Sequence, residues 1–226
     1  MMLEARDIHF AYPGQPPLFN GLDLEVHSHE RLALVAPSGV GKSTFCKLLS
    51  GYLKPHKGSV FADGSPLPTK GICPVQLIWQ HPEQAVDPHM RMKAVLAEAG
   101  PAKRRIDHRM TPSNQFVSED GSPALIDASP VNNTLCERLG IRDEWLTRRP
   151  HELSGGELQR FCIARALAAN PRYLIGDEIS TMLDAITQAQ IWKVLLEECE
   201  ARSIGLIFVS HSPALTSRIA TRVVKL

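Results

Sequence analysis

The sequence contains no feature that would carry it into a membrane or a secretory pathway. Its 226 residues include no apolar stretch approaching the roughly 20 residues that a transmembrane helix needs. The N-terminus, residues 1–7, lacks the apolar core of a signal peptide. The five cysteines form no C-x-x-C pair, and their odd number and wide spacing favour reduced thiols in a cytosolic protein. We therefore expect any membrane role to depend on a partner protein.

An excess of charge of either sign is also missing. The chain has 25 lysines and arginines against 24 aspartates and glutamates, which leaves a formal net charge of +1. Nucleic-acid-binding domains usually carry a basic surplus, so we expect no nucleic acid partner. The hydrophobic content of 43% is instead sufficient for a sizeable core, in one large domain or a domain with a lobe.

What the sequence does contain is a glycine-rich loop between a buried strand and a helix. Leu32–Val35 has the length of a strand, and apolar residues recur at helical spacing from Phe45 onward. Between them, Gly39 and Gly41 leave backbone N–H groups free to surround phosphate oxygens, and the helix dipole favours the same negative charge. The predicted phosphate-binding residues are Pro37, Ser38, Gly39, Val40, Gly41, Lys42, Ser43 and Thr44.

Two side chains in this loop have predicted roles, and one position departs from the usual pattern. We expect Lys42 to reach the β- and γ-phosphates and Ser43 to bind Mg²⁺ through its hydroxyl. The pattern G-x-x-x-x-G-K-[ST] requires glycine where this chain has Ala36, which can serve only if its φ stays negative. An ordinary glycine-rich turn is the alternative, but the order of strand, glycines, Lys-Ser-Thr and helix favours a phosphate site.

Polar side chains follow three other apolar runs. The run at 172–176 ends in Asp177 and Glu178, of which the first can hold Mg²⁺ through water and the second can polarise an attacking water. Gln80 and His211 end two further predicted strands, where α/β sheets bind ligands. A polar strand end is common, so neither residue alone would establish a site. The run at 204–209, before His211, is the last strand that we predict.

Residues 150–160 predict a helix with an unusual first turn. Ser154 and Glu157 form a capping box. Gly155 and Gly156 weaken the helix unless something must approach its backbone closely, so this helix start is a second candidate anion site. A capped core helix would explain the box but not the glycines. Further along, Asp184 is expected to cap another helix.

The remaining segments are less specific. Alternation within residues 1–30 predicts antiparallel strands, and Tyr12 lies at the edge of a turn between them, where its ring could stack on a nucleobase or simply pack against a strand end. Helical pieces are expected at 95–99, 134–139 and 143–148. The stretch 100–130 is rich in proline and poor in large apolar residues, so we predict mostly loop.

Taken in order, these motifs resemble those of the ATP-binding subunit of an ABC transporter. The set runs from an aromatic residue and a Walker A loop through Gln80, the signature 153–157 and the Walker B carboxylates to a D-loop and His211. The resemblance implies an α/β fold, with a P-loop NTPase core, an N-terminal antiparallel β-lobe and an inserted helical lobe. It divides one ATP-binding domain, 1–226, into core with β-lobe at 1–80 and 160–226 and a helical lobe at 81–159.

The resemblance also implies roles for individual residues. Two such domains would face head to tail, with Mg-ATP between the Walker A loop of one and the signature of the other. Tyr12 would stack on adenine and His211 would hold the γ-phosphate. The implied catalytic residues are Glu178, His211 and Gln80, the implied metal ligands are Ser43, Gln80 and Asp177, and the implied contacts across the dimer are Ser154, Gly155, Gly156 and Asp184.

Within the family, residues 150–156 and 183–192 look most like the dipeptide, oligopeptide and nickel import branch. This implies a peripheral subunit on the inner face of the cell membrane, with permease subunits, a second ATP-binding subunit and an extracytoplasmic solute-binding protein as partners. Ala36, Ile179 and Met182 depart from the family pattern and bear on turnover. Two alternatives remain: a soluble ABC-type ATPase not coupled to transport, and a weakly hydrolysing partner of a better ATPase.

Overall fold

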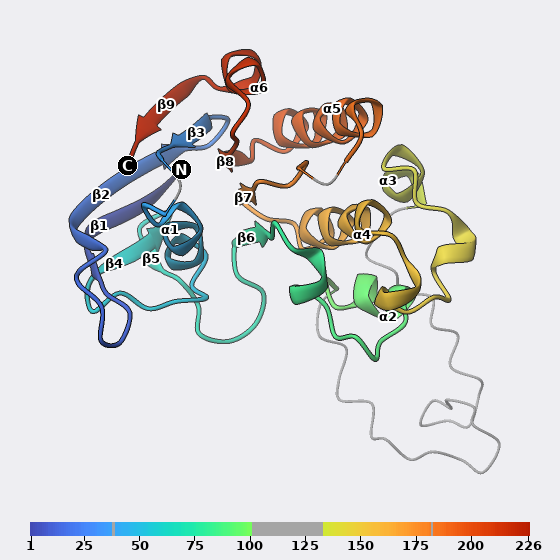
Figure 1. Cartoon of the computed structure of the whole chain (residues 1–226), viewed down its shortest axis with the longest axis horizontal. Coiled ribbons are helices and arrows are strands. Elements are labelled where there is room, and N and C mark those ends of the chain that lie inside the picture. Colours follow the sequence, from blue (N-terminus) through green and yellow to red (C-terminus); the bar gives the residue numbers. More distant parts are fainter. Residues whose placement is uncertain (38, 101–132, 182) are drawn as a thin grey trace, which may run out of the picture.

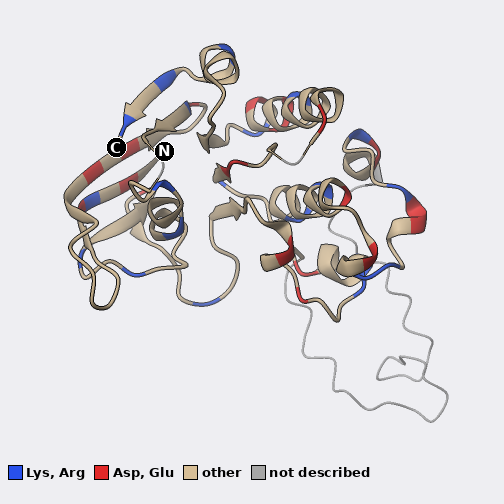
Figure 2. Ribbon diagram, in the orientation of Figure 1, with Lys and Arg blue, Asp and Glu red and all other residues tan. Residues whose placement is uncertain are grey.

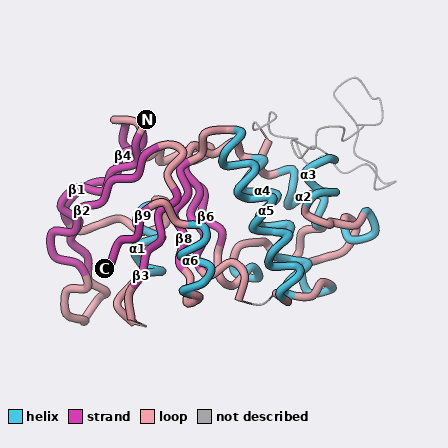
Figure 3. The backbone as a smooth tube through the Cα atoms, turned by 90° about the horizontal axis from the view of Figure 1, so that it is seen from above, coloured by secondary structure: helices cyan, strands magenta, loops and turns pink. Residues whose placement is uncertain are grey.

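The computed structural model describes residues 1–37, 39–100, 133–181 and 183–226, which form two β-sheets with helices between and beyond them (Figure 1). Predictions on Ser38, on Met182 and on 101–130 lie outside the described residues. Seen from above, the layers run from the antiparallel sheet through the parallel sheet to α4 and α5, with α2 and α3 outermost (Figure 3). The predicted α/β class is confirmed.

The antiparallel sheet is built from the N-terminal part of the chain, as predicted. Its strands are β1 (Met2–Phe10), β2 (Phe19–His27), β4 (Lys57–Ala62) and β5 (Ser65–Pro66), in the order β2-β1-β4-β5. Asp63 and Gly64 form the two-residue turn between β4 and β5, where Ala62 pairs with Ser65. Asp63 adopts a left-handed backbone, with φ of 52°. This turn directs the aspartate side chain back toward the second sheet.

All strands of the second sheet are parallel. They are β6 (Val75–Ile78), β7 (Tyr173–Asp177), β8 (Gly205–Val209), β3 (Arg31–Val35) and β9 (Arg222–Lys225), in the order β6-β7-β8-β3-β9. The prediction that 204–209 is the last strand is wrong, because β9 follows it and pairs with β3. This edge strand is short and mostly exposed, so it lacks the apolar run by which the others were recognised.

Helices lie on both faces of the parallel sheet, with α1 on one side and α4 and α5 on the other. The described helices are α1 (Lys42–Leu49), α2 (Met92–Ala97), α3 (Asn133–Arg138), α4 (Gly155–Ala168), α5 (Ala185–Ala201) and α6 (Pro213–Ile219), with 3₁₀ turns at Pro82–Gln84, Asp143–Trp145 and Pro150–Glu152. Side chains of β7 alternate between two cores: Tyr173 and Ile175 pack on the side of α1, and Leu174 packs on the side of α4 and α5. Burial on both faces explains why these strands read as continuous apolar runs.

One predicted helix is wrong. Residues 143–148 form only the 3₁₀ turn Asp143–Trp145, since the backbone carbonyls of Leu146 and Arg148 accept hydrogen bonds from the N–H groups of Lys93 and Met92. These carbonyls satisfy the first donors of α2, which has no side-chain cap. The segment that follows Trp145 therefore supplies the N-terminal hydrogen bonds of α2.

Charged residues are interspersed along α3, α4 and α5 rather than gathered by sign (Figure 2). Some of them tie the helices together: the Arg138 guanidinium lies 3.0 Å from Glu197 Oε2 and also contacts Glu198, joining α3 to α5. All five cysteines are free, as predicted, and burial raises the pKa of Cys162 to about 11, which keeps that thiol neutral. In the part of the chain that the structure describes, no helix is long and apolar enough to cross a membrane.

Candidate active site

Four adjacent strands place polar side chains at one edge of the parallel sheet. Gln80 lies just past β6, Asp177 ends β7, His211 lies just past β8, and the glycine-rich loop follows β3. Because parallel strands end at the same edge, residues far apart in sequence meet there. This edge is the candidate active site.

Glu178 lies between the two other predicted catalytic residues. Gln80 Nε2 donates a hydrogen bond of 2.9 Å to Glu178 Oε2, and His211 Nε2 lies 2.8 Å from Glu178 Oε1. The Glu178 side chain is 13% exposed, and its backbone has a φ of 49°, which is strained for a residue other than glycine. Both carboxylate oxygens are therefore held, and the strained backbone aims them toward Gln80 and His211.

Asp177, unlike Glu178, has a carboxylate oxygen without a partner. Asp177 is 6% exposed, and its Oδ1 has no hydrogen-bond partner among the described residues. Burial raises the pKa of Asp177, a hydrogen bond with Ser43 opposes this, and the charge of Glu178 adds to it. An unpaired buried carboxylate oxygen beside a serine hydroxyl fits a hard divalent cation such as Mg²⁺.

The described residues contain no cluster of three or more His, Cys, Asp or Glu that could hold a metal ion by itself. A cation at Asp177 and Ser43 would need oxygen ligands from elsewhere. Mg²⁺ bound with phosphate groups uses only one or two carboxylates, so this small donor set agrees with Mg²⁺ held jointly by protein and nucleotide.

The glycine-rich loop folds around the Lys42 ammonium. Lys42 is 8% exposed, and its Nζ donates to the carbonyl oxygens of Ala36 at 2.8 Å and Pro37 at 3.1 Å. Gly41 has a φ of 100°, and a Cβ added there would lie 2.8 Å from Leu18 Cδ2, so this position requires glycine. Ala36 does not adopt a positive φ, so the condition under which alanine can occupy its position is met.

Tyr12 lies against the first turn of α1. Its hydroxyl is 3.0 Å from Thr44 Oγ1, and its ring meets the ring of Phe10 edge to face at a centroid distance of 5.1 Å. The residue remains 36% exposed. The structure therefore places this ring next to the start of α1, where it packs against Phe10 and stays partly exposed.

The signature serine caps its own helix. Ser154 Oγ accepts from Glu157 N at 3.3 Å, and Ser154 N donates to Glu157 Oε2 at 2.8 Å, which confirms the predicted capping box. A Cβ added to Gly156 would lie 3.0 Å from Leu183 Cδ2, a tight contact with the end of that side chain. No hydrogen bond among the described residues joins Ser154 to the phosphate loop.

Asp184 is likewise engaged in capping. Its Oδ1 accepts from the N–H groups of Ile186 and Thr187, both at 3.0 Å. The bond from Thr187, followed by its hydroxyl and the other backbone donors, lowers the pKa of Asp184. The predicted N-cap of α5 is confirmed, and the carboxylate is held ionised at the end of the loop that follows Glu178.

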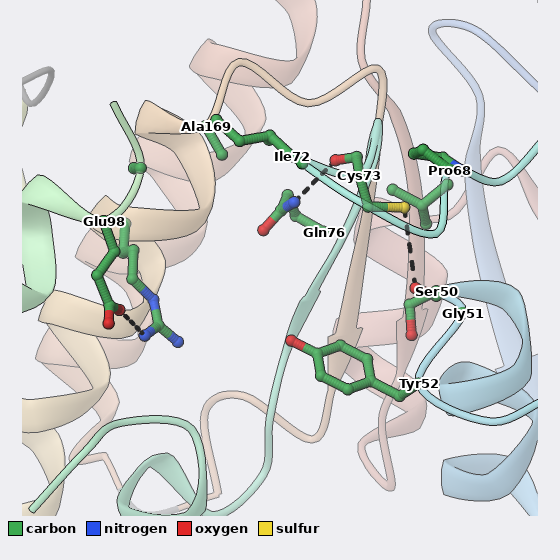
Figure 4. A pocket seen from close by; sticks show the side chains of 13 residues that line it. Ser50, Gly51, Tyr52, Pro68, Ile72, Cys73, Gln76, Glu98 and Ala169 are labelled. Atoms are coloured by element: carbon green, nitrogen blue, oxygen red, sulfur yellow. Dashed lines mark hydrogen bonds and ion pairs between the residues drawn. The ribbon is translucent and has the colours of Figure 1, made fainter. Parts of the chain in front are cut away.

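A separate hollow of about 310 Å³ lies between the end of α1 and the helical layers (Figure 4). Tyr52 and Cys73 line its core side, and Glu98 lines the opposite side, where it forms an ion pair of 2.9 Å with Arg165 of α4. Its lining shares no residue with the predicted site.

Sequence reasoning missed one polar residue beside the site. Gln159, on α4, is 3% exposed, and its Nε2 donates to the carbonyl oxygen of Trp79 at 3.2 Å, directly before Gln80. The available signal was a polar side chain between the apolar residues Leu158 and Phe161 of a predicted helix.

Comparisons with known proteins identify the family and the fold. A sequence profile of the family described as "ABC transporter" matches residues 19–181. The chain is 31% identical over 98% of its length to the "Probable D,D-dipeptide transport ATP-binding protein DdpF" of Escherichia coli (strain K12), of which it covers 68%. It is 30% identical over 95% of its length to the "Nickel import ATP-binding protein NikE" of Shigella dysenteriae serotype 1 (strain Sd197), covering 79% of that protein.

Some relatives are much longer than this chain. It is 32% identical over 98% of its length to the "Glutathione import ATP-binding protein GsiA" of Salmonella typhimurium, but spans only 36% of that protein. Among solved structures, the dimeric ATP-binding cassette MJ0796 bound to ADP and Pi superposes with a TM-score of 0.79 at 20% identity, over 99% of this chain and 94% of that one. The structural likeness supports the fold.

Proposed function

Because the chain belongs to the ABC transporter family of ATPases, we propose that it is the ATP-hydrolysing subunit of a membrane import system, with Glu178 as the base that activates water. The convergence of Gln80 and His211 on Glu178, beside the unpaired Asp177 oxygen, supports this role most directly. This arrangement places a base that Gln80 and His211 contact next to a carboxylate oxygen that is available to bind a cation.

In this proposal, Mg²⁺ would be bound by Ser43, Asp177 and Gln80, and when bound it neutralises charge on the β- and γ-phosphates. Lys42 exchanges the carbonyls of Ala36 and Pro37 for phosphate oxygens, because an ammonium gains more from an anion than from neutral acceptors. The backbone of residues 37–41 and the hydroxyl of Thr44 complete the phosphate site, which includes Ser38, Gly39, Val40 and Gly41.

Each Glu178 carboxylate oxygen has one contact, with Gln80 or with His211, and keeps a second acceptor position for a proton from water. Gln80 and His211 would hold the carboxylate in place while water attacks the γ-phosphate. Tyr12 would orient the adenine by stacking on its partly exposed ring. Proton transfer can therefore use contacts that already exist in this chain.

A second cassette completes the site in this proposal. Ser154, Gly155 and Gly156 of one copy would contact ATP bound to the other, and Asp184 would lie across the same interface. Two observations support it: these residues bond within their own helices rather than to the phosphate loop, and the MJ0796 cassette was solved as a dimer. The second subunit is either another copy or a related chain.

The import role and its partners are inferred from the relatives. Proteins named for D,D-dipeptide transport, glutathione import and nickel import resemble nearly the whole of this chain, which supports peptides or nickel as the cargo class. We accordingly propose permease subunits and a solute-binding protein as partners, and a position on the inner face of the cell membrane. The division into core, with residues 1–80 and 160–226, and lobe, with residues 81–159, belongs to the same proposal.

The test is Mg-ATP hydrolysis by the purified chain beside Glu178→Gln, with association followed by light scattering. We expect turnover to fall at least about 100-fold in the variant, since general bases contribute that much, while ATP still drives dimer formation. Glu83→Gln is the matched control, because Glu83 also pairs with a histidine, His81 at 3.3 Å, but on the surface. Unchanged turnover in Glu178→Gln would contradict the proposed base, and absence of the chain from complexes with an integral membrane subunit would contradict the transport role.

A further inference from the structure

Three side chains of α4 donate hydrogen bonds to main-chain carbonyls of the segment 79–85, and we propose that the first of them, Gln159, is a positioning residue for ATP hydrolysis. Gln159 would act by fixing the peptide that precedes Gln80. The inference rests on the proposed function, because it assumes that Gln80 and Glu178 serve the reaction.

The three bonds form a regular series, which we call the carbonyl ladder. They run from Gln159 Nε2 to the Trp79 oxygen at 3.2 Å, from Cys162 Sγ to the Pro82 oxygen at 3.8 Å, and from Arg165 Nη2 to the Ala85 oxygen at 2.6 Å. Donors and acceptors both advance by three residues from one bond to the next. The segment 79–85 is therefore fastened along α4 at regular intervals, with the first bond nearest the site.

The ladder connects two parts of the proposed machinery through one helix. Ser154 caps the N-terminus of α4, and Gln159 lies within the same helix, α4 (Gly155–Ala168). The segment at the other side of the ladder carries Gln80, whose Nε2 holds Glu178. A change at the signature end of α4 therefore reaches Glu178 of the same chain through Gln159, Trp79 and Gln80.

The ring of Trp79 is fixed independently of its carbonyl. The Tyr52 ring meets it edge to face at a centroid distance of 5.1 Å, and the Lys47 ammonium lies 4.9 Å from its centroid. Lys47 belongs to α1, the helix that follows the phosphate loop. With the ring held from α1, the bond from Gln159 decides how the Trp79 peptide is turned, and this peptide leads directly into Gln80.

Gln159 is a poor choice if its role is only to fill space. Its side chain is 3% exposed, and Oε1 has no hydrogen-bond partner among the described residues. An unpaired buried polar atom is destabilising, and a methionine of similar length would avoid it. The glutamine thus keeps one satisfied donor at the expense of one unsatisfied acceptor, which indicates that the donor to Trp79 is what the position requires.

The experiment compares Gln159→Met with Gln76→Met in the full chain. Gln76, on β6, also donates from Nε2 to a main-chain carbonyl, that of Cys73 at 2.8 Å, but it lies on the far side of Trp79 from Gln80. We expect kcat for Mg-ATP to fall roughly 10-fold in Gln159→Met, with KM within about twofold, because misplacement affects the reaction more than binding. Gln76→Met should keep the kcat of the original chain.

A second readout reports position without requiring turnover. The chain has three tryptophans, so labelling with 5-fluorotryptophan gives three ¹⁹F resonances, and Trp79→Phe identifies the one from Trp79. We expect this resonance to shift or broaden in Gln159→Met before nucleotide is added, and to remain unchanged in Gln76→Met. Gln159→Leu should reproduce the effect, and spectra of the folded chain remain interpretable if either variant is less stable.

Two results would separate failure of this inference from failure of the proposed function. If Gln159→Met retains both its kcat and the original Trp79 resonance while the unmodified chain hydrolyses ATP, the positioning role is wrong and the ATPase assignment stands. If the unmodified chain does not hydrolyse ATP, the proposed function is contradicted, and an unperturbed Trp79 resonance in Gln159→Met would separately contradict the positioning role of Gln159.

Discussion

Strand β7 has an aspartate near each end, and the two carboxylates have opposite surroundings. Near its N-terminal end, Asp63 accepts hydrogen bonds from Tyr173 Oη at 2.7 Å, Arg172 Nη1 at 2.5 Å and the Met2 amide at 2.9 Å. At its C-terminal end, Asp177 leaves Oδ1 without a partner among the described residues. Both oxygens of the Asp63 carboxylate therefore accept hydrogen bonds, whereas one oxygen of the Asp177 carboxylate accepts none.

The pKa values shift in opposite directions for this reason. Burial alone would raise the pKa of Asp63, but the hydrogen bonds from Tyr173, Arg172 and Met2 outweigh it and lower the pKa. At Asp177 burial dominates and the pKa is raised. Burial raises the pKa of both residues, and the hydrogen-bond donors around each carboxylate determine the direction of the net pKa shift. We interpret the Asp63 end as structural and the Asp177 end as shaped for a ligand that the chain itself does not supply.

The strongest test of this contrast is Asp177→Asn. We expect Mg-ATP turnover to fall about 100-fold or more, since a ligand that stabilises transition-state charge is lost. The nucleotide-free variant should melt at the same temperature or higher, because an unpaired buried charge is removed. Thermal unfolding with and without Mg-ATP measures both effects, and stabilisation by Mg-ATP equal to that of the original chain would show that Asp177 is not a ligand.

The opposite outcome is expected for Asp63→Asn. Asparagine tolerates the left-handed backbone at this position but loses the charge that Tyr173 and Arg172 contact, so the free energy of unfolding should fall by about 1–3 kcal/mol. Turnover per folded molecule should stay within about twofold. Urea unfolding gives the first quantity, with the exposed residue Asp87→Asn as control. A loss of turnover without loss of stability would reverse the structural assignment.

The pH dependence should separate the two carboxylates further. The lowered pKa of folded Asp63 adds stability above its unfolded pKa of about 3.9, and this stability is lost as the pH falls through the folded value. The raised pKa of folded Asp177 favours the folded state only at low pH, and that contribution is lost as the pH rises through the folded value.

Unfolding free energies from pH 3 to 8 therefore test the sign of each shift. Relative to the original chain, Asp63→Asn should lose most at neutral pH and least in acid. Asp177→Asn should gain as the pH rises. Parallel curves for all three proteins would mean that neither environment differs from that of the unfolded chain.

The smallest effect is expected from Ala36→Gly, which restores the usual phosphate-loop pattern. Ala36 already avoids a positive φ, so the variant should change turnover by less than about threefold and lower the free energy of unfolding by at most about 1 kcal/mol. Steady-state Mg-ATP hydrolysis by the variant and the original chain measures the change in turnover. A tenfold gain in turnover would mean that residue 36, rather than the unpaired oxygen of Asp177, determines the activity at this end of the sheet.

Local chemistry made part of this structure predictable. The helix start after the glycine-rich loop, the capping box at Ser154 and the N-cap at Asp184 each depend on residues within a few positions of one another, and the structure contains all three. The position of polar residues after buried strands also predicted which edge of the sheet holds the candidate site. Sequence order was sufficient there because parallel strands end together.

Contacts between distant segments were not predictable in the same way. The bonds of Asp63 with Arg172 and Tyr173 join residues more than 100 positions apart, and nothing near Asp63 in the sequence indicates them. The carbonyl ladder was missed because its acceptors are main-chain atoms, which any residue provides. The predicted helix at 143–148 failed since its carbonyls serve α2 instead, a tertiary preference that local propensity does not contain.

The strand order has a consequence for synthesis of the chain. Both neighbours of β3 in the parallel sheet, β8 and β9, are made long after it, and Arg31 N bonds to Thr221 Oγ1 across 190 residues. The antiparallel sheet, complete by Pro66, has all its strands available long before. During translation β3 must therefore wait, with its apolar residues unpaired, until β8 and β9 have left the ribosome. The strand that leads into the proposed nucleotide site is thus made long before the strands with which it pairs.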